Sequence, residues 1–342
     1  MTALAADGIE ILKAPRPPPP GIPARLSTVM VGLRAADQKR ILMLDQEALE
    51  IVNARVGTHK MAQRKASTTM IRTSIMRAMH QVLDADPKIL DDPLAVGLVE
   101  GSSPDEILAA APDSRPPPWF RSIFVLRSRY TEDSLEEAVA NGIGQYVLLG
   151  AGMDTFAYRQ PSWAARLRIL EIDHPESQKI KREYLVKGGI TVPANVEFLP
   201  IDFEHRSLAE GLAASSLDRR APTFFSWLGV TQYLTREAID STLRFLLSMP
   251  RRSEIVMEFI LPPDSWTPEE AVFLTKVVQM VGELGEPWLT YFTPNEISDH
   301  LLKLGASRVS HLTLEDAAAR YFLNRHDGLR PPHYVNLLRA TV

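Results

Sequence analysis

The segment YVLLGAGMDTFAYR contains residue types that can hold a ligand against the main chain. An apolar run leads directly into Gly150-Ala151-Gly152, where glycine lets the backbone turn tightly and lets a ligand approach it closely. About 20 residues later, a second apolar run carries Glu171 and ends at Asp173. An acid at this distance from a glycine loop can accept hydrogen bonds from both ribose hydroxyls of an adenosine cofactor. The loop and the acids together predict an adenosine-binding site.

Two residues after the glycines indicate which adenosine cofactor is bound. The dinucleotide fingerprint G-x-G-x-x-G needs a third glycine, and Thr155 stands at that position. Asp154 places a negative charge where a diphosphate would need the positive end of a helix, and the sequence has no G-x-x-x-x-G-K-[ST]. The same charge is compatible with a ligand that carries an ammonium and a sulfonium. We therefore predict S-adenosylmethionine as the cofactor.

A third candidate contact follows the next apolar run, LPIDF. Asp202 can accept a hydrogen bond from the adenine amino group, and Phe203 can stack nearby. Alone, Asp202 would be interpreted as a helix-capping residue. Because it comes after a predicted strand, as the glycine loop and Asp173 do, the adenine-binding interpretation is favoured.

These residues need a sheet that brings several strand ends together. Seven short apolar runs, five of them separated by helical segments, predict a mostly parallel sheet with right-handed crossovers. The runs are 145–149, 168–172, 196–201, 223–228, 254–260, 307–314 and 334–342. Seven strands fit the Rossmann-like sheet of class I S-adenosylmethionine-dependent methyltransferases better than a six-stranded dinucleotide fold. The predicted fold class is α/β, with this sheet preceded by a helical lid.

Proline-rich stretches and changes in the spacing of apolar residues divide the chain into three predicted parts. APRPPPPGIP belongs to a proline-rich arm over residues 1–33. Residues 34–140 form a helical lid, with helical spacing at 34–56 and 67–83, and residues 141–342 form the cofactor-binding core. In the core, Thr267 and Thr293 each begin a capping box with proline at the first helical position, and Gly305 marks a helix end.

Composition and charge exclude several classes of protein. The chain has 342 residues, a formal net charge of −4 and no cysteine, so disulfides and thiolate chemistry are excluded. No apolar run reaches the roughly 18 residues of a membrane span, and the N-terminus lacks a signal-peptide pattern, which predicts a cytoplasmic protein without membrane contact. The basic stretch 59–77 lacks the aromatic residues of a nucleic-acid platform, so a solvated helix face is favoured over nucleic-acid binding.

Together these motifs resemble the leucine carboxyl methyltransferase family, and most closely its bacterial branch of polyketide-type carboxyl O-methyltransferases. The run G-A-G-x-D-T-x-x-Y-R is matched from Gly150 to Arg159, and EIDHPESQKIKREYL follows it. Residues 67–78 are similar to the family's S-x-T…R-A stretch, which implies that Thr69 and Arg77 bind the cofactor. FVLRSRYTED is similar to the helix whose arginine meets the cofactor carboxylate, here Arg127. The resemblance extends from about residue 65 to the end of the chain.

One position departs from the family pattern. After the fourth strand the family commonly has an acid followed by glycine, whereas this chain has Leu228 followed by Gly229. The contact that the acid makes is not available from Leu228. A cofactor-binding scaffold without chemistry therefore stays among the alternatives.

The sequence favours methyl transfer to a carboxylate. Transfer from a sulfonium needs no acid, and a carboxylate is already ionised near neutral pH, so alignment and desolvation suffice. We predict Arg127 as a carboxylate clamp on the cofactor or the substrate, because its fork matches that geometry, and Tyr233 as the residue that orients the acceptor. No histidine has metal-ligand spacing, so no metal site is predicted. The predicted acceptor is a small, largely apolar carboxylic acid. A hydroxyl or phenol, or a protein C-terminal carboxylate, is the alternative, and the oligomeric state is not predicted.

Overall fold

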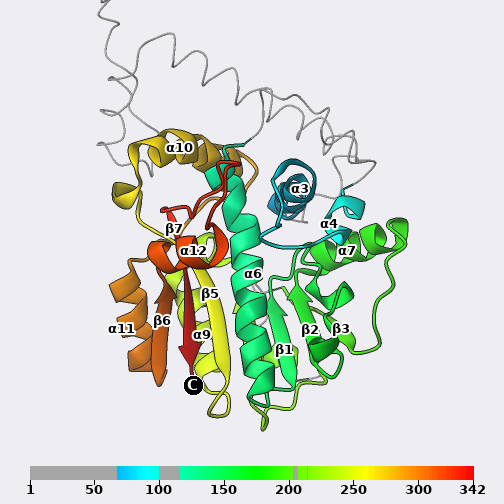
Figure 1. Cartoon of the computed structure of the whole chain (residues 1–342). Coiled ribbons are helices and arrows are strands. Elements are labelled where there is room, and N and C mark those ends of the chain that lie inside the picture. Colours follow the sequence, from blue (N-terminus) through cyan, green and yellow to red (C-terminus); the bar gives the residue numbers. More distant parts are fainter. Residues whose placement is uncertain (1–67, 100–115, 203–206, 214) are drawn as a thin grey trace, which may run out of the picture.

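The computed structural model describes residues 68–99, 116–202, 207–213 and 215–342, which form a seven-stranded sheet between layers of helices (Figure 1). All seven predicted strands are confirmed, each within two residues of its predicted ends. They are β1 (Gln145–Leu149), β2 (Arg168–Asp173), β3 (Val196–Pro200), β4 (Phe224–Trp227), β5 (Glu254–Ile260), β6 (Arg308–Leu312) and β7 (Val335–Thr341).

The strand order β3-β2-β1-β4-β5-β7-β6 brings the predicted site residues together. Strands β1 to β5 pair in parallel, and β7 runs antiparallel to both of its neighbours. Leu149, the last residue of β1, lies opposite Ile172 of β2 on one side and Trp227 of β4 on the other. The residues that follow these three strands therefore meet at one edge of the sheet, where ligands bind in open parallel sheets.

Helices bury both faces of the sheet, which explains why the strands are continuous apolar runs instead of alternating ones. Val147 and Leu149 of β1 pack on the side of α9 (Arg236–Leu247) and α11 (Pro294–Leu304). Tyr146 and Leu148 pack on the opposite side, against α6 (Pro118–Ala140), which crosses the front of the sheet in Figure 1.

The predicted helix boundaries in the core are confirmed. Thr267 and Thr293 form capping boxes with Glu270 and Glu296, at the starts of α10 (Pro268–Glu283) and α11. Gly305 ends α11 with a φ of 111°, a left-handed conformation that favours glycine. The other helices in the described ranges are α3 (Thr68–Leu83), α4 (Leu94–Gly97), α7 (Pro175–Lys187), α8 (Leu208–Leu212) and α12 (Leu314–Tyr321).

Helices α3, α4 and α10 lie beyond the carboxyl ends of the parallel strands, opposite the end marked C in Figure 1. Helix α6 instead packs along the sheet. The predicted arm and the predicted helix at 34–56 lie outside the described residues, and the division into parts 1–33, 34–140 and 141–342 stays a prediction.

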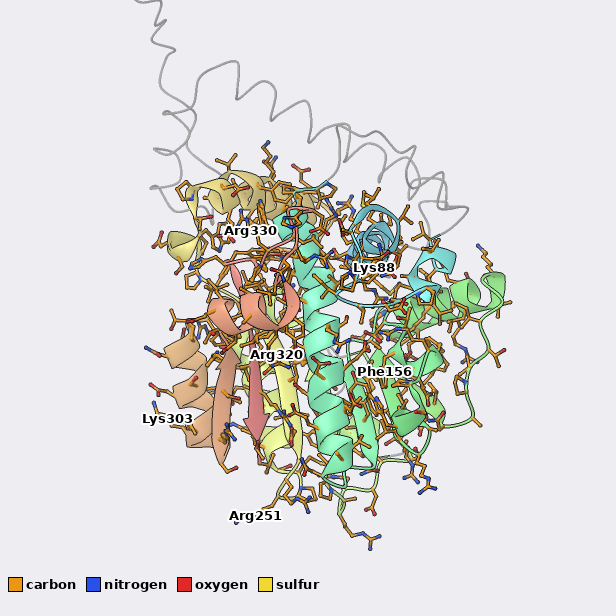
Figure 2. The ribbon with its side chains drawn as sticks, viewed as in Figure 1. Lys88, Phe156, Arg251, Lys303, Arg320 and Arg330 are labelled. Carbon is orange, nitrogen blue, oxygen red and sulfur yellow. The ribbon has the colours of Figure 1, made fainter. Side chains whose placement is uncertain are left out.

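Figure 2 shows that Lys303 and Arg251 extend away from the molecule, whereas Phe156 lies among the side chains beside α6 and is 1% exposed. Within the described ranges, no helix has the length and apolar character needed to cross a membrane.

Candidate active site

The glycine loop begins directly after β1 and has the backbone shape that its sequence predicts. Gly150 and Gly152 have φ angles of 68° and 47°, and the amides of Gly150 and Ala151 donate to the Ile172 carbonyl at 2.8 and 3.0 Å. A Cβ on Gly150 would lie 2.3 Å from Cγ2 of Val230, so this glycine is required by packing within the chain. A Cβ on Gly152 would lie 3.3 Å from Cγ of Met70 on α3, on the side where a cavity opens.

Asp173, at the end of β2, is held against this loop. Its Oδ2 accepts from the Gly152 amide at 2.6 Å, and its Oδ1 accepts from the His174 amide at 2.7 Å. Burial raises the pKa of Asp173, and the hydrogen bonds from these two amides oppose that rise. The predicted pairing of loop and acid is therefore present in the structure.

A cavity of about 140 Å³, here called the loop cavity, lies between the loop, Asp173 and α3. Its lining includes two cationic side chains, Arg77 and Arg127, and two acidic ones, Asp154 and Asp173. The described lining therefore has no net positive charge to attract an anionic diphosphate. A ligand that carries both an ammonium and a carboxylate matches its equal numbers of acidic and cationic side chains. The other lining residues are Thr69, Met70, Thr73, Ser128, Leu148, Leu149, Gly150, Ala151, Gly152, Met153, Ser177, Ser226 and Leu228.

Arg77 and Asp154 form an ion pair that connects α3 to the loop. Arg77 Nη1 lies 3.5 Å from Asp154 Oδ2, and Nη2 donates to the Met153 carbonyl. Burial favours the neutral acid, but the charges of Arg77, Lys181 and Arg159 outweigh it and hold the pKa of Asp154 below its usual value. Asp154 therefore stays ionised, as the cofactor prediction requires.

The rest of the D-T-x-x-Y-R motif binds to other parts of the chain. The Thr155 hydroxyl donates to Asp92 at 2.7 Å, in the segment before α4, and Arg159 forms an ion pair with Glu132 of α6. Asp92 is fully buried, and Nε of Arg159 lies 3.5 Å from its Oδ1, so the motif also supplies this acid with a cation. The motif fixes the turn after the loop and anchors the N-terminal helices to it.

Glu171 and Asp202 are not among the described residues that line the loop cavity. Glu171 is fully buried, 2.7 Å from Lys181 Nζ, and it accepts from the Tyr158 hydroxyl at 2.8 Å. Burial raises its pKa, and Lys181 opposes the rise. Asp202 lies 3.6 Å from Nε2 of His174, and Phe203 lies outside the described residues.

A second cavity of about 160 Å³, here called the apolar cavity, adjoins the loop cavity. Thr69, Thr73 and Arg127 line both of them. The aromatic and aliphatic lining comes mainly from α6 and α10, and comprises Met76, Pro116, Phe120, Ile123, Phe124, Tyr233, Ile260, Phe273, Val277, Met280, Val281, Trp288 and Tyr334. The polar lining comprises Thr69, Arg72, Thr73, Arg127, Gln232, Glu258 and Lys276.

Arg127 lies at the junction of the two cavities. Its Nη1 lies 3.1 Å from Oε2 of Glu258 in β5, and its Cζ lies 5.1 Å from the centre of the Phe124 ring. Glu258 is 3% exposed. Glu258 is not among the site residues predicted from the sequence, although an acid inside the apolar run EIVMEFI is a signal that could have pointed to it.

Tyr233 lies in the apolar cavity, as the last residue of the short turn η4 (Thr231–Tyr233). Burial raises the pKa of Tyr233, and its neighbours Trp288 and Thr69 moderate the rise. Burial also raises the pKa of Tyr334 well above its usual value.

None of the described histidines lines either cavity, and no group of three or more histidine or acidic side chains in the described ranges is arranged to hold a metal ion.

The sheet order and the loop–acid pair define a class I S-adenosylmethionine-dependent methyltransferase, and comparison with known proteins agrees. A family model described as leucine carboxyl methyltransferase matches residues 70–247, so the chain belongs to this family. Its cofactor is S-adenosylmethionine, and the predicted fold class and enzyme class are confirmed.

Two relatives and one solved structure illustrate the similarity. The chain is 33% identical over 225 residues to YktD of Bacillus subtilis, described as a candidate S-adenosylmethionine-dependent methyltransferase, with 62% of this chain and 71% of the relative covered. It is 30% identical over 281 residues to a protein of Mycobacterium ulcerans with the same description, covering 78% and 88%. A structure of a candidate methyltransferase from Thermobifida fusca shares the fold, with a TM-score of 0.51, 16% identity and coverage of 79% and 93%.

Proposed function

We propose that the chain transfers the methyl group of S-adenosylmethionine to the carboxylate of a small, largely apolar acid, forming a methyl ester. The apolar cavity is the observation that carries this proposal. Its described lining combines aromatic and aliphatic side chains with three cations, Arg72, Arg127 and Lys276, and a single carboxylate, Glu258. An apolar cavity with a net positive lining favours an apolar anion.

In this proposal the loop cavity holds the cofactor. Asp173 accepts hydrogen bonds from the ribose, the backbone of Gly150-Ala151-Gly152 approaches the cofactor closely, and Arg127 clamps a carboxylate. Thr69 and Arg77 cover the cavity from α3, and the ionised Asp154 keeps Arg77 in place. When bound, the cofactor supplies a methyl group on a positively charged sulfur.

Three further residues, Asp202, Phe203 and Glu171, have separate places in the proposal. Contact of the adenine with Asp202 and Phe203 stays part of it. Glu171 supports β2 through its ion pair with Lys181.

The chain's own residues align the acceptor and exclude water, and no base is needed. The described lining contains no histidine, and the raised pKa values keep Tyr233 and Tyr334 protonated at neutral pH. A carboxylate, with a pKa near 4, is already ionised under these conditions. Its alignment with the methyl group can then supply several kcal/mol of the catalytic effect.

The acceptor class is tested by the product that forms and by the pH dependence of kcat/KM. A panel of apolar carboxylic acids, incubated with the enzyme and labelled S-adenosylmethionine, is expected to yield methyl esters detected by mass spectrometry. Because a carboxylate is ionised at both ends of the range, kcat/KM should be nearly flat between about pH 6 and pH 8. A phenol without a base should instead show a rise of about tenfold per pH unit.

A hydroxyl or phenol acceptor is the second candidate, and Glu258 is the observation that favours it. Glu258 is the carboxylate in the described lining of the apolar cavity, and it would serve as the base for such an acceptor. The product would then be an ether. Treatment with mild alkali hydrolyses an ester but not an ether, so a stable product would replace the carboxyl proposal. A peptide with a free C-terminus belongs in the same panel, as the third acceptor class.

Tyr233→Phe is expected to raise the KM for the acceptor by about fivefold, because it removes one neutral hydrogen bond. The affinity for S-adenosylhomocysteine should stay unchanged. Tyr321→Phe is the matched control: its hydroxyl donates to Asp133 at 2.8 Å, and the residue lines neither cavity. Steady-state kinetics of both variants test the role, and an unaltered acceptor KM in Tyr233→Phe would remove Tyr233 from the proposal.

A further inference from the structure

The ion pair between Arg127 and Glu258 uses a single nitrogen of the guanidinium. Both carboxylate oxygens of Glu258 accept from Nη1 of Arg127, Oε2 at 3.1 Å and Oε1 at 3.5 Å. A fork-to-fork pair would engage two nitrogens side by side. A guanidinium has five N–H donors in a rigid fork, so this end-on pair is geometrically compatible with a second carboxylate on another edge of Arg127.

Glu258 approaches Arg127 from the side of the apolar cavity. It lines that cavity and is not among the described residues that line the loop cavity, whereas Arg127 lines both. Its side chain is 4% exposed, and a carboxylate buried to this extent needs a charged partner. The pair therefore fixes the guanidinium from the apolar side and places a negative charge there.

Gly229, on the neighbouring strand end, makes room for the same guanidinium. Trp227 of β4 lies opposite Met257 of β5, so Gly229 just beyond β4 and Glu258 in β5 reach Arg127 from adjacent strands. Gly229 has a φ of 68°, and a Cβ there would lie 2.6 Å from Nη1 and 3.3 Å from Cζ of Arg127. Any larger residue would have to displace the guanidinium.

We propose that Glu258 and Gly229 are positioning residues for Arg127, which direct its remaining edge to the carboxylate of the cofactor's methionine. The inference rests on the proposed role of Arg127 as a carboxylate clamp. The family resemblance already implies a contact between Arg127 and the cofactor carboxylate, and the inference adds that Glu258, from the acceptor side, and Gly229 set the direction of the guanidinium.

The test compares two ligands that differ in the amino-acid carboxylate. S-adenosylhomocysteine has it, and 5′-methylthioadenosine lacks it. By calorimetry, Glu258→Ala should weaken S-adenosylhomocysteine binding about tenfold, because a charge-assisted contact is misplaced, and change 5′-methylthioadenosine binding less than about twofold. Glu258→Gln, whose amide oxygen can still accept from Nη1, should stay within about threefold of the unmodified protein for both ligands.

Two results for Glu258→Ala would overturn the inference. Equal weakening of both ligands would show a general structural effect. Unchanged or tighter binding of S-adenosylhomocysteine would show that Glu258 only reduces the positive potential of Arg127.

Gly229→Ala tests the same inference independently, also if Glu258→Ala does not fold. As a single substitution it should weaken S-adenosylhomocysteine binding about tenfold. Added to Arg127→Ala it should have no further effect, because the group that it displaces is absent. Equal weakening in both backgrounds would mean that backbone strain alone is responsible. These measurements contain no acceptor, so a failure to find a methyl ester would count against the proposed acceptor and not against this inference.

Discussion

Lys181→Met is expected to destabilise the protein by about 3–5 kcal/mol at neutral pH, because it leaves the Glu171 carboxylate buried without its cation. The two side chains are 1% and 0% exposed, and Nζ of Lys181 lies 2.7 Å from Oε2 of Glu171. Chemical denaturation measures the free energy of unfolding. The double variant Lys181→Met with Glu171→Gln is the control and should recover most of the loss, because no buried charge remains.

The loss of unfolding free energy in Lys181→Met should depend on pH, in a direction that follows from the pKa of Glu171. Burial raises the pKa of Glu171 in the folded protein, and removal of Lys181 would raise it further. A carboxyl group whose folded pKa exceeds its unfolded value of about 4.3 binds protons more tightly when folded, so stability falls as pH rises between the two values. The deficit of Lys181→Met should therefore be smaller near pH 5 than near pH 7. An equal deficit at both values would show that Glu171 remains ionised.

Gly152→Val is expected to reduce the affinity for S-adenosylhomocysteine by more than about 100-fold while the protein still folds. A Cβ at this position would lie 3.3 Å from Cγ of Met70 and beside the loop cavity, so a valine side chain would occupy space that the cofactor needs. Calorimetry measures the affinity, and circular dichroism verifies the fold.

Gly142→Val is the matched control for Gly152→Val. Gly142 also has a positive φ, 93°, but a Cβ there would meet nothing within 4 Å, and the residue lines neither cavity. Both variants strain the backbone, whereas only the valine at position 152 also meets Met70 and the loop cavity. Normal ligand affinity in a folded Gly152→Val protein would contradict the placement of the cofactor.

The sequence predicts the sheet well because each strand is a local feature. Seven apolar runs bounded by helix-forming segments locate the strands, and the threonine caps and Gly305 locate helix ends from interactions within a few residues. The loop and Asp173 are predictable for the same reason, since each directly follows a strand and parallel strands end at one edge.

The partners of the charged side chains could not be predicted. Arg127 and Glu258 are 131 residues apart in the chain, and their pairing depends on how α6 crosses β5. Glu171 is another example, because its position before Asp173 in the same strand does not reveal its ion pair with Lys181 of α7. A sequence shows that an acid lies at a strand end, but not which cation a neighbouring helix brings against it.

The position of β7 determines the order in which the sheet can be assembled during synthesis. Strand β7 lies between β5 and β6, and among the described strands β7 alone joins β6 to the sheet. Residues 254–260 and 308–312 leave the ribosome before residues 335–341, so β6 has no partner in the sheet until the later segment arrives. Until then, the edge of β5 presents unpaired amides and carbonyls, which is the kind of surface that pairs with other chains. A nascent or truncated chain that stops before β7 is therefore expected to aggregate, even though the loop and Asp173 are already present in it.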